Sequence, residues 1–328
     1  MKILSSLGIG FDCASKEEIK IVLSWGVDPS RIIFANSKKP LSYIKYAANQ
    51  GIELYTFDNE SELYKFKKVY PSAKLILRFK CDDFVSDRVM GSKFGCDAVA
   101  EAPALMNLAH SLKLNIVGVS FHIGTNCLSP GAFKKAIFIA HNLFKLGDSI
   151  GFHMHILDIG GGFPGSRRST FDAVASVINK SLDDYFPIDS NVSIIAEPGR
   201  YFTQSAFTLA TQIHSKRVIS DPVTALYRNV YYINDGVYGT FFLKVYNLDL
   251  YTPTLLSDGR FRERRSSSIL GASNNPLDVI KENIILPDLD VGEWIIFKNM
   301  GAYTMSAPRP SNLFPKPKLF SILNKSSM

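Results

Sequence analysis

Cysteine is scarce in this sequence of 328 residues, and none of its four cysteines (Cys13, Cys81, Cys96 and Cys127) belongs to a Cys-X-X-Cys pair. The sequence therefore predicts free thiols in a reducing compartment rather than a disulfide framework. No run of about 18 apolar residues occurs, so no transmembrane helix is expected. The first residues also lack the apolar core of a secretory signal. These absences together predict a cytoplasmic protein with no membrane partner.

Basic residues are in excess but are not concentrated. The formal net charge is +7, and the densest cluster is Arg262, Arg264 and Arg265. Three serines follow this cluster, so we interpret it as the solvated edge of a loop. No recognised nucleic-acid-binding module is present, so nucleic acid is not expected as a partner. The hydrophobic content of 46% and the charged content of 20% indicate a globular chain.

Seven short apolar segments alternate with amphipathic ones through the first 200 residues. Their near-continuous apolar character is typical of parallel strands buried on both faces. The alternation favours an α/β fold, either a (β/α) barrel or a doubly wound sheet. The expected strands are residues 9–13, 32–35, 54–57, 74–78, 116–121, 155–159 and 193–196.

The segments between these strands carry helix signals. Ser15 with Glu18 has the spacing of a capping box, and residues 59–62 open a second helix in a similar way. Two further helices are expected over residues 132–147 and 171–186.

The pattern changes after residue 200, where strand-like segments follow one another without long helices between them. We therefore expect a barrel-type domain over residues 1–202 and a β-rich domain over residues 203–328. The prolines at the end of the chain predict an irregular tail over residues 307–317. The strand-like segments are residues 205–217, 228–235, 264–270 and 293–298.

Polar residues stand at or just after the carboxyl end of every expected parallel strand. Barrels and open sheets build their active sites at this end, although loops are polar in any case. The seven residues are Asp12, Asn36, Asp58, Arg78, His122, Asp158 and Glu197.

Three of these strand ends carry groups with specific chemistry. The glycines of residues 160–165 let backbone N–H groups approach a phosphate, although such turns are often only tight connections. Glu197 has the chemistry to pair with a protonated ring nitrogen, and Arg200 to clamp a phosphate; a buried structural ion pair is the alternative. His122 has a flat ring that can stack on a cofactor, and Thr125 has a hydroxyl for phosphate. Together these groups predict a pyridoxal phosphate site.

The chain resembles the eukaryotic ornithine decarboxylase and antizyme inhibitor family, which has the alanine-racemase-like fold. The resemblance implies a (β/α)8 TIM barrel that lacks its first strand, followed by a β-rich domain, in a protein of polyamine metabolism. The segments that carry it are residues 10–15, 44–49, 118–122, 157–165, 196–201, 234–239 and 299–304.

The resemblance also implies the role of each site residue. Glu197 would hold the pyridine nitrogen protonated, and His122 would stack on the ring with support from Asp12 and Arg78. The residues implied in phosphate and cofactor binding are Thr125, Gly160, Gly161, Gly162, Gly199, Arg200 and Tyr303. A head-to-tail homodimer is implied as well, with Lys93 and Asp278 matching an ion pair between its subunits.

The sequence departs from the family pattern where catalysis is concerned. The family strand that carries the Schiff-base lysine has no counterpart in these residues, so an N-terminally truncated chain is expected. Asn274 stands where the family has its catalytic cysteine, and Asn275 where it has an aspartate. The family's tyrosine–aspartate pair for ornithine becomes Tyr246 and Asn247. Each lost charge-assisted contact weakens ornithine binding by roughly 1–2 kcal/mol.

Three functions remain open at this point. The first is a pyridoxal phosphate-dependent decarboxylase, inactive on ornithine as written, whose longer form would use a neutral amino acid. The second is a non-catalytic, antizyme-binding protein, because residues 43–74 match the family's antizyme-binding region and retain Lys45 and Lys65. The alternative interpretation of this region is a solvated helix pair that is needed only for folding. The third is a degenerate product without function.

Overall fold

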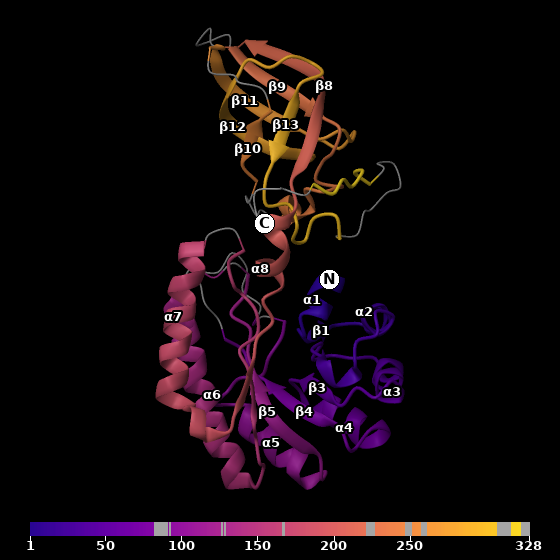
Figure 1. Ribbon diagram of the computed structural model, residues 1–328, viewed down its shortest axis with the longest axis vertical. Coiled ribbons are helices and arrows are strands. Elements are labelled where there is room, and N and C mark those ends of the chain that lie inside the picture. Colours follow the sequence, from indigo (N-terminus) through magenta and orange to yellow (C-terminus); the bar gives the residue numbers. More distant parts are fainter. Residues whose placement is uncertain are drawn as a thin grey trace. The chain divides into compact units, whose positions relative to one another are not determined.

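The computed structural model divides the chain into two compact units, Met1–Gly199 and Arg200–Met328 (Figure 1). None of the helices in its described part has the length and apolar character needed to cross a membrane. The structure describes residues 1–81, 91, 93–125, 127, 129–165, 168–220, 227–246, 251–256, 261–306 and 316–322.

The first unit contains a parallel sheet of seven strands, which follow one another in chain order and curl as in a partial barrel (Figure 1). Every neighbouring pair is parallel, so each connection crosses over and supplies the helices between strands. The predicted α/β alternation is confirmed, and all seven predicted strands are present. The strands are β1 (Phe11–Cys13), β2 (Ile32–Phe34), β3 (Leu54–Phe57), β4 (Lys74–Arg78), β5 (Asn115–Ser120), β6 (Ile156–Asp158) and β7 (Ser193–Ile195).

Helices cover the outer face of this sheet. The caps of two helices agree with the sequence signals: Ser15 accepts a hydrogen bond from the N–H of Glu18, and Asn59 accepts one from the N–H of Glu62. The helices of this unit are α1 (Lys2–Ser6), α2 (Lys16–Leu23), α3 (Leu41–Asn49), α4 (Glu60–Val69), α5 (Ala102–Ser111), α6 (Pro130–Ile150) and α7 (Arg168–Tyr185), with 3-10 turns at Pro29–Arg31 and Ile188–Ser190.

The inner strands β2 to β6 bury side chains on both faces because successive residues point to opposite sides, whereas the edge strand β7 has no buried residue. In β4, Leu75 and Leu77 join the large core beneath the helices, whereas Ile76 joins a smaller cluster on the other face. Ile33 of β2 and Val117 of β5 belong to this smaller cluster. This two-sided burial explains why the strands read as continuous apolar runs.

The second unit is β-rich, as predicted. Its six strands form one sheet in the order β10-β13-β8-β9-β11-β12, in which only β9 and β11 pair in parallel. β10 and β12 were not predicted, because β10 has three residues and β12 contains the charged pair Lys281 and Glu282. The strands are β8 (Leu209–Ser220), β9 (Tyr227–Ile233), β10 (Pro253–Leu255), β11 (Arg264–Leu270), β12 (Val279–Pro287) and β13 (Trp294–Phe297). Three short helices complete the unit: α8 (Gly199–Thr203), η3 (Gln204–Ala206) and η4 (Phe242–Tyr246).

The predicted irregular tail lies mostly outside the described residues, which resume at residue 316.

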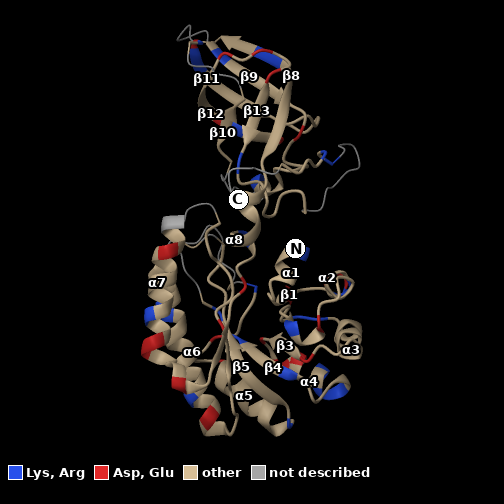
Figure 2. Ribbon diagram, in the orientation of Figure 1, with Lys and Arg blue, Asp and Glu red and all other residues tan. Residues whose placement is uncertain are grey.

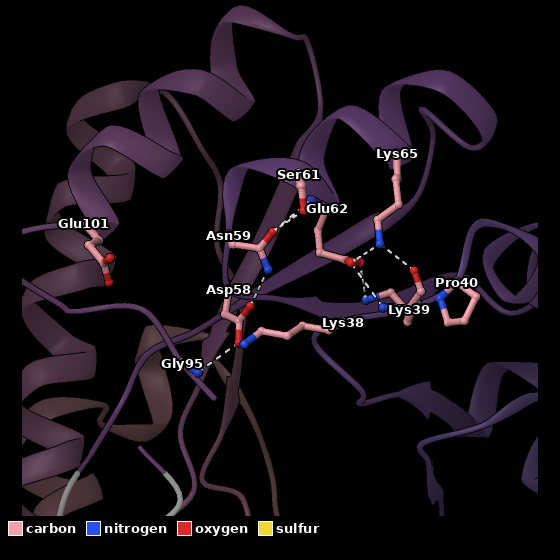
Figure 3. Close-up of a pocket in the computed structure, with 10 residues that line it drawn as sticks. All are labelled: Lys38, Lys39, Pro40, Asp58, Asn59, Ser61, Glu62, Lys65, Gly95 and Glu101. Atoms are coloured by element: carbon pink, nitrogen blue, oxygen red, sulfur yellow. Dashed lines mark hydrogen bonds and ion pairs between the residues drawn. The ribbon is translucent and has the colours of Figure 1, made fainter. Parts of the chain in front are cut away.

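A buried ion pair joins the end of β2 to α4 beside a pocket of about 650 Å³ (Figure 3). The Nζ atom of Lys39 lies 3.0 Å from Oε2 of Glu62, and both side chains are at most 1% exposed. Lys39 also donates to the carbonyl oxygens of Thr56 and Asn36, at 2.6 and 2.8 Å. Burial lowers the pKa of Lys39 to about 8, against the opposing effect of Glu62. The cation therefore depends on Glu62 to stay charged inside the protein.

We expect Glu62→Gln to destabilise the chain by about 3–5 kcal/mol, because it leaves the Lys39 charge buried without its partner. Urea unfolding at neutral pH measures the change. The matched control is Glu53→Gln, because the Lys74–Glu53 pair is 48% and 56% exposed. Its loss is expected to cost less than about 1 kcal/mol. Equal losses in the two variants would contradict the assigned role of Glu62.

Candidate functional site

Five polar side chains gather at the carboxyl end of the curled sheet. Strand register places Arg78 opposite Ser120, and Ser120 opposite Asp158. His122 follows β5 by two residues, and Glu197 follows β7. The electrostatic influence of Glu197 and of Arg78 on Asp12 brings β1 into the same group. The structure therefore assembles the predicted residues Asp12, Arg78, His122 and Glu197, together with Asp158.

Two other strand-end residues serve local structure instead. Asn36 donates to the carbonyl oxygen of Ala14 and accepts from the N–H of Lys38. Asp58 accepts hydrogen bonds from Ser37 and from the N–H of Gly95 (Figure 3). These contacts explain the polarity of both positions without a ligand.

Asp158 and Glu197 form a hydrogen-bonded carboxyl pair. Burial raises the pKa of Asp158, and Oδ1 of this residue also accepts the N–H of Gly160 at 2.8 Å. Burial, and then the charge of Asp158, raise the pKa of Glu197 well above its usual range. Two neighbouring buried carboxyls cannot both ionise readily, so the pair retains one proton more easily than an exposed pair would.

Asp12 adds a third carboxyl to the group. Loss of hydration among the surrounding protein atoms raises its pKa well above the usual range, and the charges of Glu197 and Glu18 add to this effect. Solvent still reaches the side chain, which weakens the effect through screening. Arg78 acts in the opposite direction on all three carboxyls.

His122 is neutral in this surrounding. Burial lowers its pKa to about 4, and the positive charge of Arg78 contributes to the same change. Nδ1 of the ring accepts the N–H of Gly124 at 3.0 Å, which leaves the hydrogen of the neutral ring on Nε2. A neutral imidazole in a fixed orientation can stack on a flat ring without adding charge.

Steric packing requires glycine at two positions of the predicted phosphate loop. A Cβ atom on Gly160, which has a φ of +59°, would lie 1.9 Å from the carbonyl oxygen of Phe121. A Cβ atom on Gly161 would lie 2.6 Å from Nε2 of His122. Gly162 also has a positive φ of +113°. The tight connection considered for this motif therefore explains its glycines, and phosphate binding stays a prediction.

The remaining phosphate residues are distributed over the chain. Thr125 lies half-buried just after the His122 turn, and a Cβ atom on Gly199 would meet no atom within 4 Å. In the second unit, the guanidinium of Arg200 lies 5.1 Å from the centre of the Tyr303 ring. Tyr303 has a φ of +57°, unusual for a residue with a side chain. The second unit thus brings Arg200 and Tyr303 together.

The residues at the sheet end fit a pyridoxal ring. Oγ of Ser120 is buried and has no hydrogen-bond partner among the described residues, so a polar group is unsatisfied beside Arg78 and Asp158. The carboxyl pair supplies an acceptor for a ring N–H, and His122 supplies a flat neutral surface. Sequence reasoning assigned Asp158 no role of its own, and nothing but strand register distinguishes Ser120.

Asn274 and Asn275, which stand at predicted catalytic and substrate positions, lie in a loop that Asp278 holds. The Asp278 side chain is 3% exposed, and its oxygens accept the N–H groups of Val237 at 2.7 Å and Ser273 at 3.0 Å. Asn274 and Asn275 are exposed on this loop. These bonds account for a buried Asp278 without a cation from another subunit, so its predicted pairing with Lys93 stays a prediction. Asn247 and the side chain of Tyr246 lie outside the described residues.

Comparison with known proteins agrees with this arrangement. Residues 1–204 match the pyridoxal binding domain of the pyridoxal-dependent decarboxylases. Ornithine decarboxylase of Rattus norvegicus is 43% identical over 98% of this chain and 72% of its own length. Antizyme inhibitor 2 of Xenopus laevis is 43% identical over 96% of this chain and 71% of its own length.

Solved structures give the same result. The arginine decarboxylase of Paramecium bursaria Chlorella virus, bound to agmatine, superposes with a TM-score of 0.86 at 37% identity, covering 93% of this chain and 80% of that one. The predicted architecture, a barrel-like domain followed by a β-rich domain, is thereby confirmed. Pyridoxal phosphate is the cofactor of the family whose pyridoxal binding domain matches this chain. The chain belongs to this pyridoxal-dependent decarboxylase family, which includes ornithine decarboxylases and antizyme inhibitor 2.

Proposed function

We propose that this chain binds pyridoxal phosphate at the carboxyl end of its parallel sheet and decarboxylates ornithine poorly or not at all. The observation that carries the first part is the buried Asp158–Glu197 pair beside a neutral His122. Glu197 would accept the ring N–H, His122 would stack on the ring, and Arg78 and Asp12 would balance charge around it. Bound pyridoxal phosphate would supply an electron sink for amino-acid chemistry.

The proposed phosphate end combines backbone and side-chain donors. The N–H groups of the glycine loop and the hydroxyls of Thr125 and Tyr303 would donate hydrogen bonds to the phosphate. Arg200 adds a charge-assisted contact, for which its planar guanidinium is suited. The proposed members are Thr125, Gly160, Gly161, Gly162, Gly199, Arg200 and Tyr303.

Three amides argue against ornithine as the substrate. Asn274 stands where the family has a cysteine proton donor, and an amide cannot act as that acid. Asn275 replaces an aspartate near the distal ammonium of ornithine, and Tyr246 with Asn247 replaces a tyrosine–aspartate pair. A neutral amino acid makes no use of these charges and loses less affinity.

Glu197→Gln is expected to weaken pyridoxal phosphate binding by about tenfold. The Glu197 carboxyl can ionise against a protonated ring nitrogen and accept a charge-assisted hydrogen bond from it, which an amide cannot do. Absorbance titration of the cofactor measures this affinity. Glu17→Gln is the control, because the Glu17 side chain is 69% exposed. Unchanged affinity in Glu197→Gln would contradict the proposed ring contact.

The same variant tests the raised pKa of Glu197. A raised folded-state pKa contributes stability at low pH, and this contribution is lost as the pH rises through it. The glutamine of the variant cannot ionise. The unfolding free energy of the variant should therefore rise relative to that of the parent between about pH 5 and about pH 8. Urea unfolding of the cofactor-free chain at both pH values provides the comparison. A difference in stability that stays constant over this range would show that the pKa of Glu197 is not raised.

Asn275→Asp is expected to increase ornithine affinity of the cofactor-loaded chain about tenfold, because it restores a charge-assisted contact to the ammonium. Isothermal titration calorimetry measures the change without requiring turnover. Norvaline, which has no distal ammonium, is the control ligand and should bind both proteins equally. Equal gains for ornithine and norvaline would refute the assignment of Asn275.

Antizyme binding is the second candidate function. It is supported by the similarity to antizyme inhibitor 2. It is also supported by the regular structure of residues 43–74, which contain most of α3 and all of β3 and α4. Lys45 is exposed on α3, and Lys65 on α4 contacts the Lys39 carbonyl and the Glu62 carboxylate. Acidic residues begin α4 and lysines end it, so both signs of charge are presented there (Figure 2).

Lys45→Glu should weaken antizyme binding by about tenfold or more, because reversing an exposed charge turns an attraction into a repulsion. Glu197→Ala should leave this binding unchanged, since Glu197 lies at the cofactor site. Surface plasmon resonance with immobilised antizyme compares the variants. Loss of binding in Glu197→Ala but not in Lys45→Glu would exclude this segment as the binding surface.

A further inference from the structure

Arg78 is the positive charge that the ionisable groups at the sheet end share. It ends β4 and is half-buried, next in register to Ser120 and Asp158. Asp12, on β1, and Glu197, after β7, also experience its charge. The position of one guanidinium therefore influences the whole group.

The ring of Phe94 lies against this guanidinium. The Cζ atom of Arg78 is 5.1 Å from the ring centre, within the range of a cation–π interaction. The segment that carries Phe94 runs beside β4, where the N–H of Cys96 donates to the Arg78 carbonyl at 3.0 Å. In return, the N–H of Lys80 donates to the Cys96 carbonyl at 2.8 Å. The segment that carries Phe94 and the end of β4 that carries Arg78 are thus joined by backbone hydrogen bonds.

Two further contacts fix the backbone on both sides of Phe94. The N–H of Gly95 donates to Oδ2 of Asp58 at 2.9 Å, and Nζ of Lys38 donates to the Lys93 carbonyl at 2.6 Å. Gly95 has a φ of +89°, and a Cβ atom there would lie 2.5 Å from the Lys80 nitrogen. Figure 3 shows Asp58 and Gly95 joined at the edge of the pocket. These contacts hold the backbone that carries Phe94 beside β4.

Two other cations also lie close to the Phe94 ring. Nζ of Lys93 lies 5.1 Å and Nζ of Lys38 lies 5.8 Å from its ring centre. Three positive groups around one ring repel each other, and the negative face of the ring offsets part of that repulsion. A leucine of similar bulk would provide packing but not this compensation.

We infer that Phe94 is a positioning residue, whose ring holds the Arg78 guanidinium toward the carboxyls at the carboxyl end of the sheet. The inference rests on the proposed function only in that these carboxyls form the proposed cofactor site. Without the ring, the Arg78 guanidinium loses its cation–π contact and the compensation for its repulsion by Lys38 and Lys93, so its position relative to Asp158 and Glu197 is no longer fixed. Phe94 touches none of the proposed reacting atoms and acts through Arg78.

His122 reports the position of Arg78. The groups that face this part of the site are Asp12 from β1, Asp158 from β6, Glu197 after β7 and Arg78 from β4, with Glu18 of α2 beyond Asp12. Among these groups, Arg78 is the charge that contributes to the low pKa of His122. Withdrawal of Arg78 should therefore raise the pKa of His122, whereas a general loosening of distant packing should not.

The experiment is an NMR titration of the six histidines in the cofactor-free chain, with the His122 signal assigned from His122→Gln. Phe94→Leu and Phe94→Met should move the pKa of His122 upward by about half a pH unit, the size expected when a nearby cation moves by a few ångströms. Phe94→Tyr keeps the ring and should leave it unchanged. Lys38→Gln is the control for a cation that contacts Phe94 but does not act on His122.

An unchanged pKa of His122 in folded Phe94→Leu or Phe94→Met would overturn the inference, as would an equal rise in Phe94→Tyr. Cofactor titration of the same proteins separates this result from the proposed function. If the parent binds no pyridoxal phosphate but the pKa of His122 responds as expected, the proposed function fails and the role of Phe94 stands. If the parent binds the cofactor and Phe94→Leu changes neither quantity, the reverse holds.

Discussion

Two carboxyl groups held within hydrogen-bonding reach, away from bulk water, constrain the carboxyl end of the parallel sheet. Burial raises the pKa of both Asp158 and Glu197, so the pair holds a proton that isolated surface carboxyls would release near neutral pH. The charge of Arg78 opposes this effect, and it also helps to keep His122 neutral. The arrangement forms a surface that is polar, nearly balanced in charge and able to accept a protonated heterocycle.

The backbone around this pair is correspondingly tight. Gly160 donates its N–H to Asp158 and passes so close to Phe121 that no side chain fits. Gly161 leaves room for the His122 ring in the same way. The glycines therefore serve the position of the acid and the imidazole, whether or not they also contact a phosphate. Phosphate binding and tight packing both require glycine at these positions. The glycine motif alone therefore does not distinguish a phosphate loop from a tight connection.

The contacts that hold the scaffold can be separated from the side chains exposed on it. The first unit keeps the acid pair, the imidazole and the arginine of a cofactor site, and the second unit keeps the Asp278 contacts that hold residues 271–278. The side chains exposed on that loop, Asn274 and Asn275, are amides. An amide neither donates a proton as an acid nor pairs as an anion with an ammonium. Under the proposed function, this loop therefore presents two side chains that do not act on ornithine.

The sequence by itself determined the parallel strands, the succession of a barrel-like and a β-rich domain, and the family, because strand periodicity and contiguous motifs are local properties of the chain. Only the tertiary structure decided how residues from different strands interact. The raised pKa values of Asp158 and Glu197 and the contact of Phe94 with Arg78 arise between residues that are distant in sequence. The burial of Ser120 likewise follows from its place in the sheet. The strand β12 was not predicted from the sequence, because its charged residues Lys281 and Glu282 interrupt the apolar run that marks a strand. Its pairing with β11 is visible only in the structure. Pairing, burial and the pKa values that follow from them depend on which segments meet in space.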